Sequence, residues 1–376
     1  MAKVETSKVS EELNEWMRAR GATFDEQGKR VRFVGEEAED DQKGIEAVLE
    51  EGLGWVARAP RETLTIAGDD AIPWLQGLVT SDLMKLAEEG SGQRTAWVNH
   101  TGRFVGEARL LHFPEMLLVD LEEGTLAGGL MGHLRRHIIL EKVKLEDRSA
   151  RTFVVGLYGR GAALVLDQAG SWAHRMAPHS RPMFSGTWGE VAGCGVVVQR
   201  VPWCVDEAYE LRVDVGDALQ VMAAVEEAVG RPLALCGERG FERLRLSAGV
   251  PRFGVELHEK VIPLEAGFED AIAYAKGCYL GQEIIARLDS RGQAAKMLRA
   301  LTLGGSEAPE VGQAAEVEID GKWTKKGDVI SVAKSPDGAS YRALVFMKRG
   351  AYEMGETIRV GEAISQLEPL LTLPGA

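Results

Sequence analysis

The sequence is poor in cysteine and has no paired cysteine motif. Its 376 residues include four cysteines, and none of them lies in a CxxC pair. This spacing argues against a disulfide framework and against a zinc site, and it fits a reducing compartment. We therefore expect a cytoplasmic protein without a metal centre.

Positive charge is also scarce, because the chain carries a formal net charge of −13. Nucleic acids and anionic membranes reward clustered lysine and arginine, so we expect neither as a partner. No apolar run approaches the ~20 residues that span a bilayer. The stretch 1–20 contains four glutamates and no apolar core of a signal peptide, so we expect no secretory leader.

What the chain does contain is ordinary globular composition, with 45% hydrophobic and 27% charged residues. Helical spacing predicts short helices, and alternating apolar residues predict strands joined by hairpins. The expected helices cover 10–20 (capped by Ser10), a short segment after Asp70, 126–140, and a segment after Asp217. The expected strands cover 62–67, 94–98, 104–111, 116–121, 152–158, 193–200 and 210–215. This mixed order favours an α+β fold over a doubly wound parallel sheet.

The pattern changes after about Asp289. Short strands are expected at 298–303, 315–319, 327–333, 342–347 and 356–360. Asp-Gly pairs at 320–321 and 337–338 are typical turn signals between strands. This spacing predicts a small β-barrel or sandwich at the C-terminal end.

The segment Lys276–Glu283 holds the most informative motif, KGCYLGQE. Gly277 and Gly281 permit a tight backbone or a close approach to a ligand. Lys276 beside Cys278 would favour the thiolate, which is the reactive form of cysteine. The alternative is a buried structural cysteine in a glycine-rich turn, and the residues alone leave both interpretations open.

The stretch 276–299 carries five positive and two negative residues within an acidic chain. A local basic patch of this kind suits a small anionic ligand. A solvated surface of mixed charge is an equally good interpretation.

The motif is similar to the KGCYxGQE signature of YgfZ-type folate-binding proteins, a family that includes mitochondrial members acting in iron–sulfur protein maturation. The flanking stretches 244–256, 262–267 and 284–292 resemble the same family, and weaker similarity extends from about residue 53 to the C-terminus. The resemblance implies a tetrahydrofolate cofactor and a functional role for Cys278 and Lys276. It also implies that Tyr279, Gln282, Glu283 and Arg287 contribute to folate binding.

The same superfamily contains the T-protein of the glycine-cleavage system. The stretch 202–210, PWCVDEAYE, resembles the T-protein segment that contacts the pterin, which puts Glu210 at the position of a carboxylate and Trp203 at that of an aromatic. A carboxylate can accept two hydrogen bonds from an aminopyrimidine edge, and an indole offers a flat apolar face. Without the resemblance, Glu210 is simply a solvated residue of an alternating strand.

One departure from the T-protein pattern bears on activity. The stretch 102–107, GRFVGE, stands where T-proteins have Gly-Gly-x-x-Asp-Asp, so Gly106 occupies the position of the catalytic aspartate. Glu107 follows, and alternation along a strand directs it to the opposite face. We therefore expect no useful aminomethyltransferase activity, and the sequence leaves open whether the chain is an enzyme.

Two further motifs are weaker indications of a site. His133 and His137 stand four residues apart, but no third ligand lies nearby, so helix-surface histidines are favoured over a metal site. The glycines of 156–161 do not match GxGxxG, and this segment is expected to be a strand end and turn.

Together these observations predict a three-lobed α+β fold around a folate channel. Residues 1–285 would form two lobes, 1–55 with 150–285 and 56–149, and residues 286–376 would form the barrel. The expected function is a tetrahydrofolate-binding accessory protein for iron–sulfur cluster assembly or repair, with iron–sulfur enzymes or their assembly proteins as partners. The alternatives are a tetrahydrofolate-dependent aminomethyltransferase and a non-enzymatic interaction module.

Overall fold

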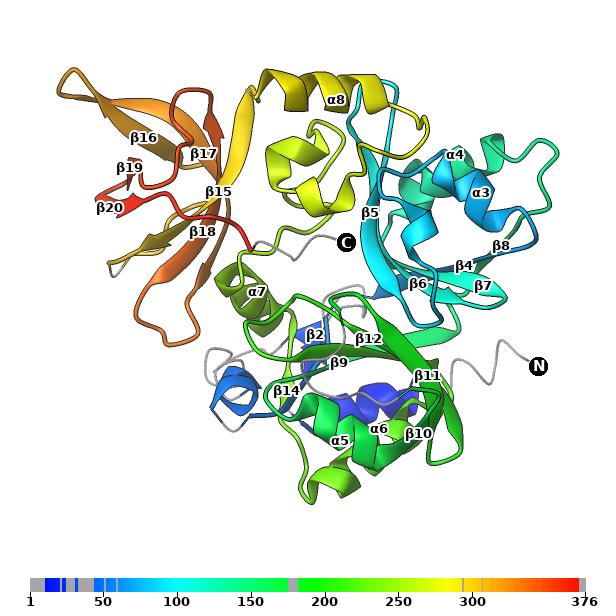
Figure 1. Cartoon of the computed structure of the whole chain (residues 1–376). Coiled ribbons are helices and arrows are strands. Elements are labelled where there is room, and N and C mark those ends of the chain that lie inside the picture. The colour runs from blue at the N-terminus through cyan, green and yellow to red at the C-terminus, as the bar shows by residue number, and fades with distance from the viewer. Residues whose placement is uncertain are drawn as a thin grey trace.

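The computed structural model describes the following residues: 11–20, 22–24, 31–32, 44–50, 52–58, 60–174, 182–292, 294–305 and 307–371. Their strands form three large sheets and one short pair, β1 (Thr23–Phe24) with β2 (Val31–Arg32). Figure 1 shows the three sheets as three lobes, each with its own layer of strands. The predicted α+β class and three-lobed arrangement are confirmed.

The first lobe is built on a seven-stranded sheet in the order β10-β11-β12-β13-β9-β3-β14. Only β14 with β3 is a parallel pair within this sheet. The strands are β3 (Gly54–Val56), β9 (Thr152–Tyr158), β10 (Gly170–Trp172), β11 (Gly186–Val191), β12 (Cys194–Arg200), β13 (Ala208–Asp214) and β14 (Leu235–Cys236). The sheet therefore joins segments from both sides of the second lobe in the sequence.

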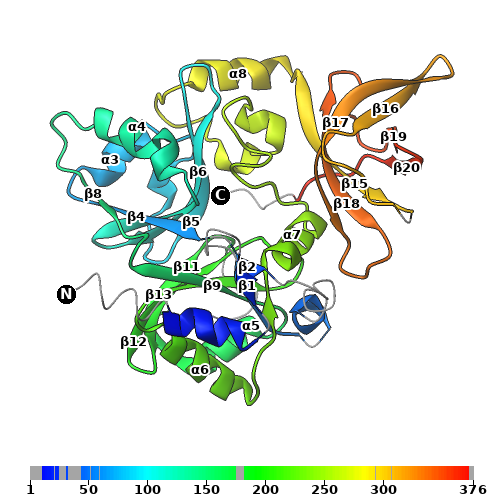
Figure 2. The ribbon, with the colours of Figure 1, turned by 180° about the vertical axis from the view of Figure 1, so that it is seen from behind.

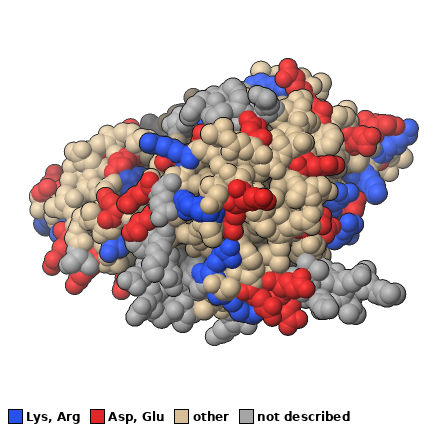
Figure 3. Space-filling model, turned by 90° about the horizontal axis from the view of Figure 1, so that it is seen from below, with Lys and Arg blue, Asp and Glu red and all other residues tan. Residues whose placement is uncertain are grey.

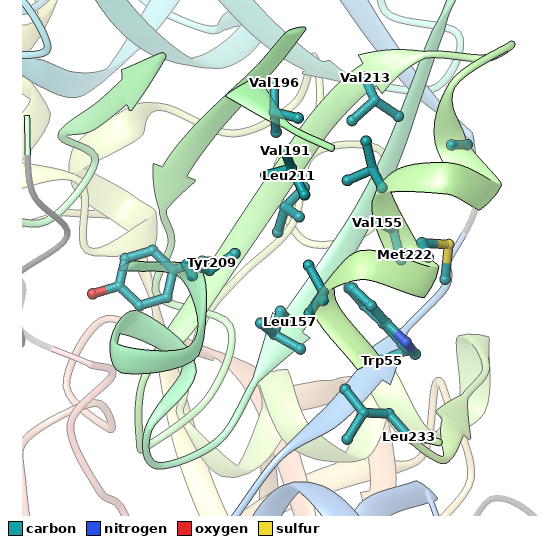
Figure 4. Packing of buried hydrophobic residues seen from close by; sticks show 14 of the residues in the cluster. Trp55, Val155, Leu157, Val191, Val196, Tyr209, Leu211, Val213, Met222 and Leu233 are labelled. Atoms are coloured by element: carbon teal, nitrogen blue, oxygen red, sulfur yellow. The ribbon is translucent and has the colours of Figure 1, made fainter. Parts of the chain in front are cut away.

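Helices α5 (Ala162–Ala169) and α6 (Ala218–Val229) pack against this sheet, together with a helix at 11–18. Apolar residues of strands and helices interdigitate there, among them Trp55, Leu157 and Met222 (Figure 4). The helix at 11–18 confirms the helix predicted at 10–20, while the proposed cap Ser10 lies outside the described residues. A further helix covers 44–49.

The second lobe is a contiguous antiparallel sheet in the order β5-β6-β7-β4-β8. Its strands are β4 (Arg61–Ala67), β5 (Gly92–Val98), β6 (Phe104–Phe113), β7 (Met116–Glu122) and β8 (Lys144–Asp147). The predicted hairpin is the β5–β6 pair, turning at 99–102. Helix α3 (Ala71–Gln76), the short turn η1 (Leu83–Lys85), the π-helical turn η2 (Leu126–Leu130) and α4 (Met131–Arg136) supply further apolar residues to its core.

The helix predicted at 126–140 is shorter than expected. The π-helical turn leads into α4, which ends at Arg136. The carbonyl of His137 accepts a hydrogen bond from the Trp74 indole (2.8 Å) instead of from another helical turn. A tertiary contact thus ends a helix that the apolar spacing would continue.

The segment after β14 connects the lobes. It contains α7 (Glu238–Ser247), the turns η3 (Pro263–Ala266) and η4 (Glu269–Ala271), and α8 (Gln282–Arg291). Arg245 of α7 is fully buried and pairs with Glu256 at 3.1 Å. Glu256 also accepts a hydrogen bond from Ser331 of the third lobe, so this ion pair joins α7 to the C-terminal sheet.

The third lobe is a six-stranded antiparallel sheet in the order β15-β18-β17-β16-β19-β20. Its strands are β15 (Lys296–Leu303), β16 (Ala314–Ile319), β17 (Lys322–Lys334), β18 (Tyr341–Lys348), β19 (Thr357–Val360) and β20 (Ala363–Gln366). Ala300 and Glu368 exchange two backbone hydrogen bonds, which bring the chain after β20 back to β15. The sheet curls accordingly, as expected for a small C-terminal barrel.

Within the described residues, no helix has the length and apolar character needed to cross a bilayer. Acidic and basic side chains are interspersed on the face shown in Figure 3. The domain boundaries expected from the sequence stay a prediction.

Candidate functional site

The KGCYLGQE segment lies on the second lobe and is held by its first residue. The ammonium of Lys276 donates hydrogen bonds to the backbone carbonyls of Gln76 (2.7 Å), Val79 (2.5 Å) and Ser81 (2.7 Å). Burial lowers the pKa of this amine to about 8. Lys276 therefore donates its hydrogen bonds to backbone carbonyls from the end of α3 to the turn before η1.

Tyr279 covers the same ammonium from the other side. Its ring centroid lies 4.8 Å from Nζ, and the side chain packs into the core beside Phe104 and Phe268. Burial raises the pKa of the Tyr279 hydroxyl to about 12. Tyr279 thus anchors the loop by packing.

The two glycines of the motif have different structural roles. Gly281 has φ +80°, and a Cβ there would lie 2.5 Å from the carbonyl oxygen of Asn99. Only glycine fits that conformation and that approach to the β5–β6 turn. Gly277 has open space around it.

Cys278 is exposed, whereas Cys194, Cys204 and Cys236 are buried. Burial raises the pKa of the Cys204 thiol to about 11 and that of Cys194 in the same direction. Cys194 and Cys204 are core thiols. The motif therefore combines an anchored lysine, an anchored tyrosine and a constrained glycine around one accessible thiol.

The residues that follow lie on the surface of α8. Gln282 is the first residue of this helix, and Glu283 pairs with Arg287 one turn later at 2.6 Å. Their side chains are 81% and 53% exposed, so this pair is a solvated one. Arg299 donates instead to the carbonyl of Tyr352 (2.8 Å). The charges expected to form a basic patch are thus directed to different partners.

Glu210 and Trp203 belong to a different group, which we call the interlobe ion cluster. Its members are buried charged side chains between the seven-stranded and five-stranded sheets: Arg58, Arg61, Glu107, Arg109, Asp120, Glu122, Glu210 and Arg212. Arg58 lies between β3 and β4, where the chain passes from one sheet to the other, and contacts both Glu122 (3.0 Å) and Glu210 (2.9 Å).

Both carboxylate oxygens of Glu210 are already hydrogen-bonded. Oε1 accepts from Arg58 (2.9 Å) and from the Trp203 indole (3.0 Å), and Oε2 accepts from Arg212 (3.2 Å). The guanidinium groups of Arg58 and Arg109 lie 4.8 and 4.7 Å from the Trp203 ring, and Phe241 contacts it edge-on. The alternative interpretation of Glu210 as a solvated strand residue is wrong, because the opposite sheet buries this face of β13.

The pKa values of two carboxyls of the cluster are shifted in opposite directions. Burial alone would raise the pKa of Glu122, but Arg58 and Arg61 outweigh it and lower it to about 2. Burial raises the pKa of Glu107 to about 8, and repulsion from Glu122 adds to this effect. Glu107 is therefore mostly protonated at neutral pH, while Glu122 is ionised.

Gly106 and Glu107 point to opposite faces of β6, as alternation predicts, but the faces are not those expected. A Cβ on Gly106 would meet Leu130, Thr125 and Trp97 at 3.3–3.5 Å, so this position faces the core under η2. Glu107 faces the interlobe ion cluster, with its carboxylate 3.9 Å from Arg109. Of these two residues, Glu107 is thus the one whose side chain lies in the cluster.

His133 does not lie on the helix surface, and that prediction was wrong. It is buried, and its Nε2 finds no hydrogen-bond partner among the described residues. Its neighbour Leu134 is part of the core, so this side of α4 packs inward. Burial and the nearby His137 lower the pKa of His133 to about 4. Within the described residues, no three His, Cys, Asp or Glu side chains are arranged so that they could hold a metal ion.

Sequence reasoning missed several members of the cluster. Asp120 and Glu122 alternate at the end of the otherwise apolar strand MLLVDLE, a pattern that signals buried charge. Tyr158 Oη, Arg212 Nε and Arg212 Nη1 are buried and lack a partner within the described part of the chain. These are unused buried donors in the cluster, on Arg212, and next to it, on Tyr158, whose pKa is raised by burial and is also affected by Glu210 and Arg58.

A pocket of about 580 Å³, which no sequence pattern indicates, lies at the outer edge of the same two sheets. Trp188 lies half exposed in its wall and donates to Glu89 (2.6 Å). The pocket is lined by Thr65, Ala67, Glu89, Phe113, Pro114, Glu115, Met116, Lys144, Glu146, Arg148, Trp188 and Val197.

The predicted site residues therefore form two groups. Lys276, Cys278 and Tyr279 precede α8, which lies at the top of Figures 1 and 2, whereas Trp203 and Glu210 belong to the lower lobe with β13. Tyr279 and Trp203 also belong to different apolar clusters.

Comparison with known proteins gives a consistent result. The chain matches the family model of the GCVT N-terminal domain over residues 13–276. It is 26% identical over 335 residues to a putative chloroplastic transferase of Arabidopsis thaliana, covering 88% of this chain and 73% of the relative. It is 26% identical over 278 residues to the tRNA-modifying protein YgfZ of Hamiltonella defensa, covering 73% and 78%.

A solved structure, the glycine cleavage system aminomethyltransferase T from Bartonella henselae, shares the fold. The TM-score is 0.80 at 15% identity, and the match covers 96% of this chain and 97% of the other.

Proposed function

Because the chain belongs to the family of GCVT N-terminal domain proteins, which confirms the superfamily resemblance found in its sequence, we propose that it is a tetrahydrofolate-binding accessory protein supporting iron–sulfur cluster assembly or repair. In this proposal the Cys278 thiol is the functional group. The observation that carries it is the exposure of Cys278 on a loop whose neighbours are anchored.

An accessible thiol on a fixed loop suits contact with another macromolecule. Cysteine reacts and binds metals through its thiolate, which requires access to solvent or to a partner. The three remaining cysteines are buried and offer no comparable access. Iron–sulfur proteins or their assembly factors, in a reducing cytoplasm, are the partners that this chemistry fits.

The residues of the interlobe ion cluster fit a reduced folate in part. Tyr158 Oη and the Nε and Nη1 atoms of Arg212 are buried donors without partners among the described residues, and folate carries many acceptor atoms. Glu210 and Trp203 are bonded to each other and to arginines, so their part is to order these donors. When bound, a reduced folate would supply one-carbon or redox chemistry.

Aminomethyl transfer is not proposed for this chain. That reaction needs a negative carboxylate beside the amine, because the carboxylate stabilises positive charge. Within the cluster, Glu107 is the carboxyl next to Gly106 in the chain, and its raised pKa keeps it mostly neutral at pH 7. Asp120, Glu122 and Glu210 are each already paired with arginines.

The test is rescue of a strain that lacks this protein. Cys278→Ser is expected to fold and to bind tetrahydrofolate in calorimetry, yet to leave several iron–sulfur enzymes inactive. Cys194→Ser, a change at a buried thiol, serves as the control and is expected to rescue. Rescue by Cys278→Ser at wild-type level would remove the thiol from the function, and absence of binding heat in the wild type would remove folate.

A further inference from the structure

Lys276 and Cys278 are two residues apart, but their side chains have different surroundings. The Lys276 ammonium lies among three backbone carbonyls, while Cys278 is exposed. Gly277, between them, meets no neighbouring atoms at its Cβ position. The lysine is therefore directed into the protein, whereas the thiol stands in open surroundings.

We propose that Lys276 is a positioning residue for Cys278, which it presents by clamping the 276–281 loop onto the backbone that follows α3. This inference rests on the proposed function of Cys278. In this role, Lys276 acts on Cys278 through the shape of its ammonium and the hydrogen bonds that it donates.

The carbonyls that Lys276 binds have few alternatives. Gln76 is the last residue of α3, and the last carbonyls of a helix lack partners within it. Val79 and Ser81 follow in the turn before η1, so their carbonyl oxygens converge from three directions on one nitrogen. An ammonium has three donors in a compact tetrahedral arrangement, which suits this site.

Hydrogen bonds on both sides of Lys276 also hold this segment against the stretch 77–80. The amide of Ala273 donates to Thr80 (2.9 Å), the Thr80 hydroxyl donates to Ala271 (2.7 Å), and the amide of Leu280 donates to Gly77 (3.4 Å). Lys276 lies between these links. Loss of its hydrogen bonds would leave the loop held only by these links and by the packing of Tyr279.

Arginine cannot replace lysine in this role, although it keeps the positive charge. Its planar guanidinium presents donors in a rigid fork and needs more room than an ammonium. Lys276→Arg therefore separates shape from charge. Lys276→Met removes both, and Lys260→Met, at an exposed lysine elsewhere, is the matched control.

The first measurement is amide hydrogen exchange on the full chain. In the wild type, the amides of Ala273 and Leu280 are expected to exchange more slowly than those of Gly277 and Cys278. Both Lys276 variants should exchange Ala273 and Leu280 at least about tenfold faster, because hydrogen bonds to a charged group are lost. Wild-type exchange that is equal at all four amides would overturn the clamp without any variant.

The second measurement is the rate of Cys278 alkylation by iodoacetamide as a function of pH. With a positioning role, the midpoint of the rate–pH profile is the same in both Lys276 variants as in the wild type. An alkaline shift of that midpoint in Lys276→Met, but not in Lys276→Arg, would show that charge is what matters and would overturn the proposal.

The third measurement is rescue of iron–sulfur enzymes, where both Lys276 variants should fail and Lys260→Met should succeed. Rescue by Lys276→Arg with wild-type exchange would refute the role of shape. If Cys278→Ser itself rescues, the proposed function fails, while exchange and alkylation still decide whether Lys276 clamps the loop.

Discussion

Arg212 of β13 and Asp120 of β7 face each other across the boundary between two lobes, with Nη2 2.6 Å from Oδ1. Both side chains are buried. At the other part of this boundary, Leu111, Phe113 and Leu118 pack against Val197. The two sheets are therefore joined by apolar packing in one place and by buried ion pairs in the other.

Replacing Glu210 by alanine is expected to destabilise the protein by about 3–5 kcal/mol, because it breaks two buried ion pairs. Arg58 and Arg212 each lose one carboxylate partner and keep the other, Glu122 and Asp120 respectively. The free energy of unfolding in urea measures this effect. Glu283→Ala breaks the exposed pair with Arg287 and should cost less than about 1 kcal/mol. Equal losses would show that the cluster is solvated.

The pH dependence of stability should report Glu107. Its pKa of about 8 in the folded protein lies above the ordinary value of 4.5, so the folded state binds more protons between these values. Stability contributed by this group is thus full below pH 4.5 and falls as pH rises towards 8, by up to ~1.4 kcal/mol per pH unit. Glu107→Gln should remove that fall, which urea unfolding at several pH values can measure.

Glu122 provides the opposite sign for comparison. Its pKa of about 2 lies below the ordinary 4.5, so its contribution is present above pH 4.5 and is lost as pH falls towards 2. Glu122→Gln should therefore lower stability at pH 7. Identical pH profiles for the wild type and Glu107→Gln would contradict the assignment of a neutral carboxyl.

Gly106→Asp is expected to destabilise the protein by about 2 kcal/mol or more, since its carboxylate would be buried against apolar groups. Leu130 and Trp97 lie next to that position. Gly106→Ala, which adds only a methyl group, should cost about 1 kcal/mol. In a single-turnover assay, Gly106→Asp should not catalyse aminomethyl transfer from a lipoyl-bound donor. Activity in this variant would contradict the finding that residue 106 faces the core and not the site.

The two motif glycines should respond differently to alanine. Gly281→Ala forces a side chain into a positive φ and towards the Asn99 carbonyl, which should cost about 2–3 kcal/mol. Gly277→Ala has open space and should stay within about 0.5 kcal/mol. Thermal unfolding of the two variants side by side checks this pair. Equal melting temperatures would show that the loop is not held against the β5–β6 turn.

Local patterns were sufficient for much of the fold. The β5–β6 hairpin and the β16–β17 and β17–β18 hairpins of the third lobe follow from alternation and turn residues, because the paired strands are neighbours in sequence. The parallel pair of β3 and β14 joins segments that are distant in the sequence, and no local pattern predicts this pairing.

The site could be predicted only in part for a related reason. Both faces of β6 are buried, so alternation separated Gly106 from Glu107 but did not tell which face meets the other lobe. The hydrogen-bond partners of Glu210 are Arg58, Trp203 and Arg212. Arg58 lies far from the other two in the sequence, so its contact could not be predicted from a local pattern. The motif around Cys278 was visible because its chemistry is contained in eight consecutive residues.

The position of β3 has a consequence for synthesis of the protein. β3 precedes the five-stranded lobe, yet its neighbours β9 and β14 are both made after that lobe. On the ribosome, the strands from 61 to 147 are complete before β3 has any partner in its sheet, so the five-stranded lobe can fold while β3 is still unpaired. Strand β3 is thus translated early and stabilised late.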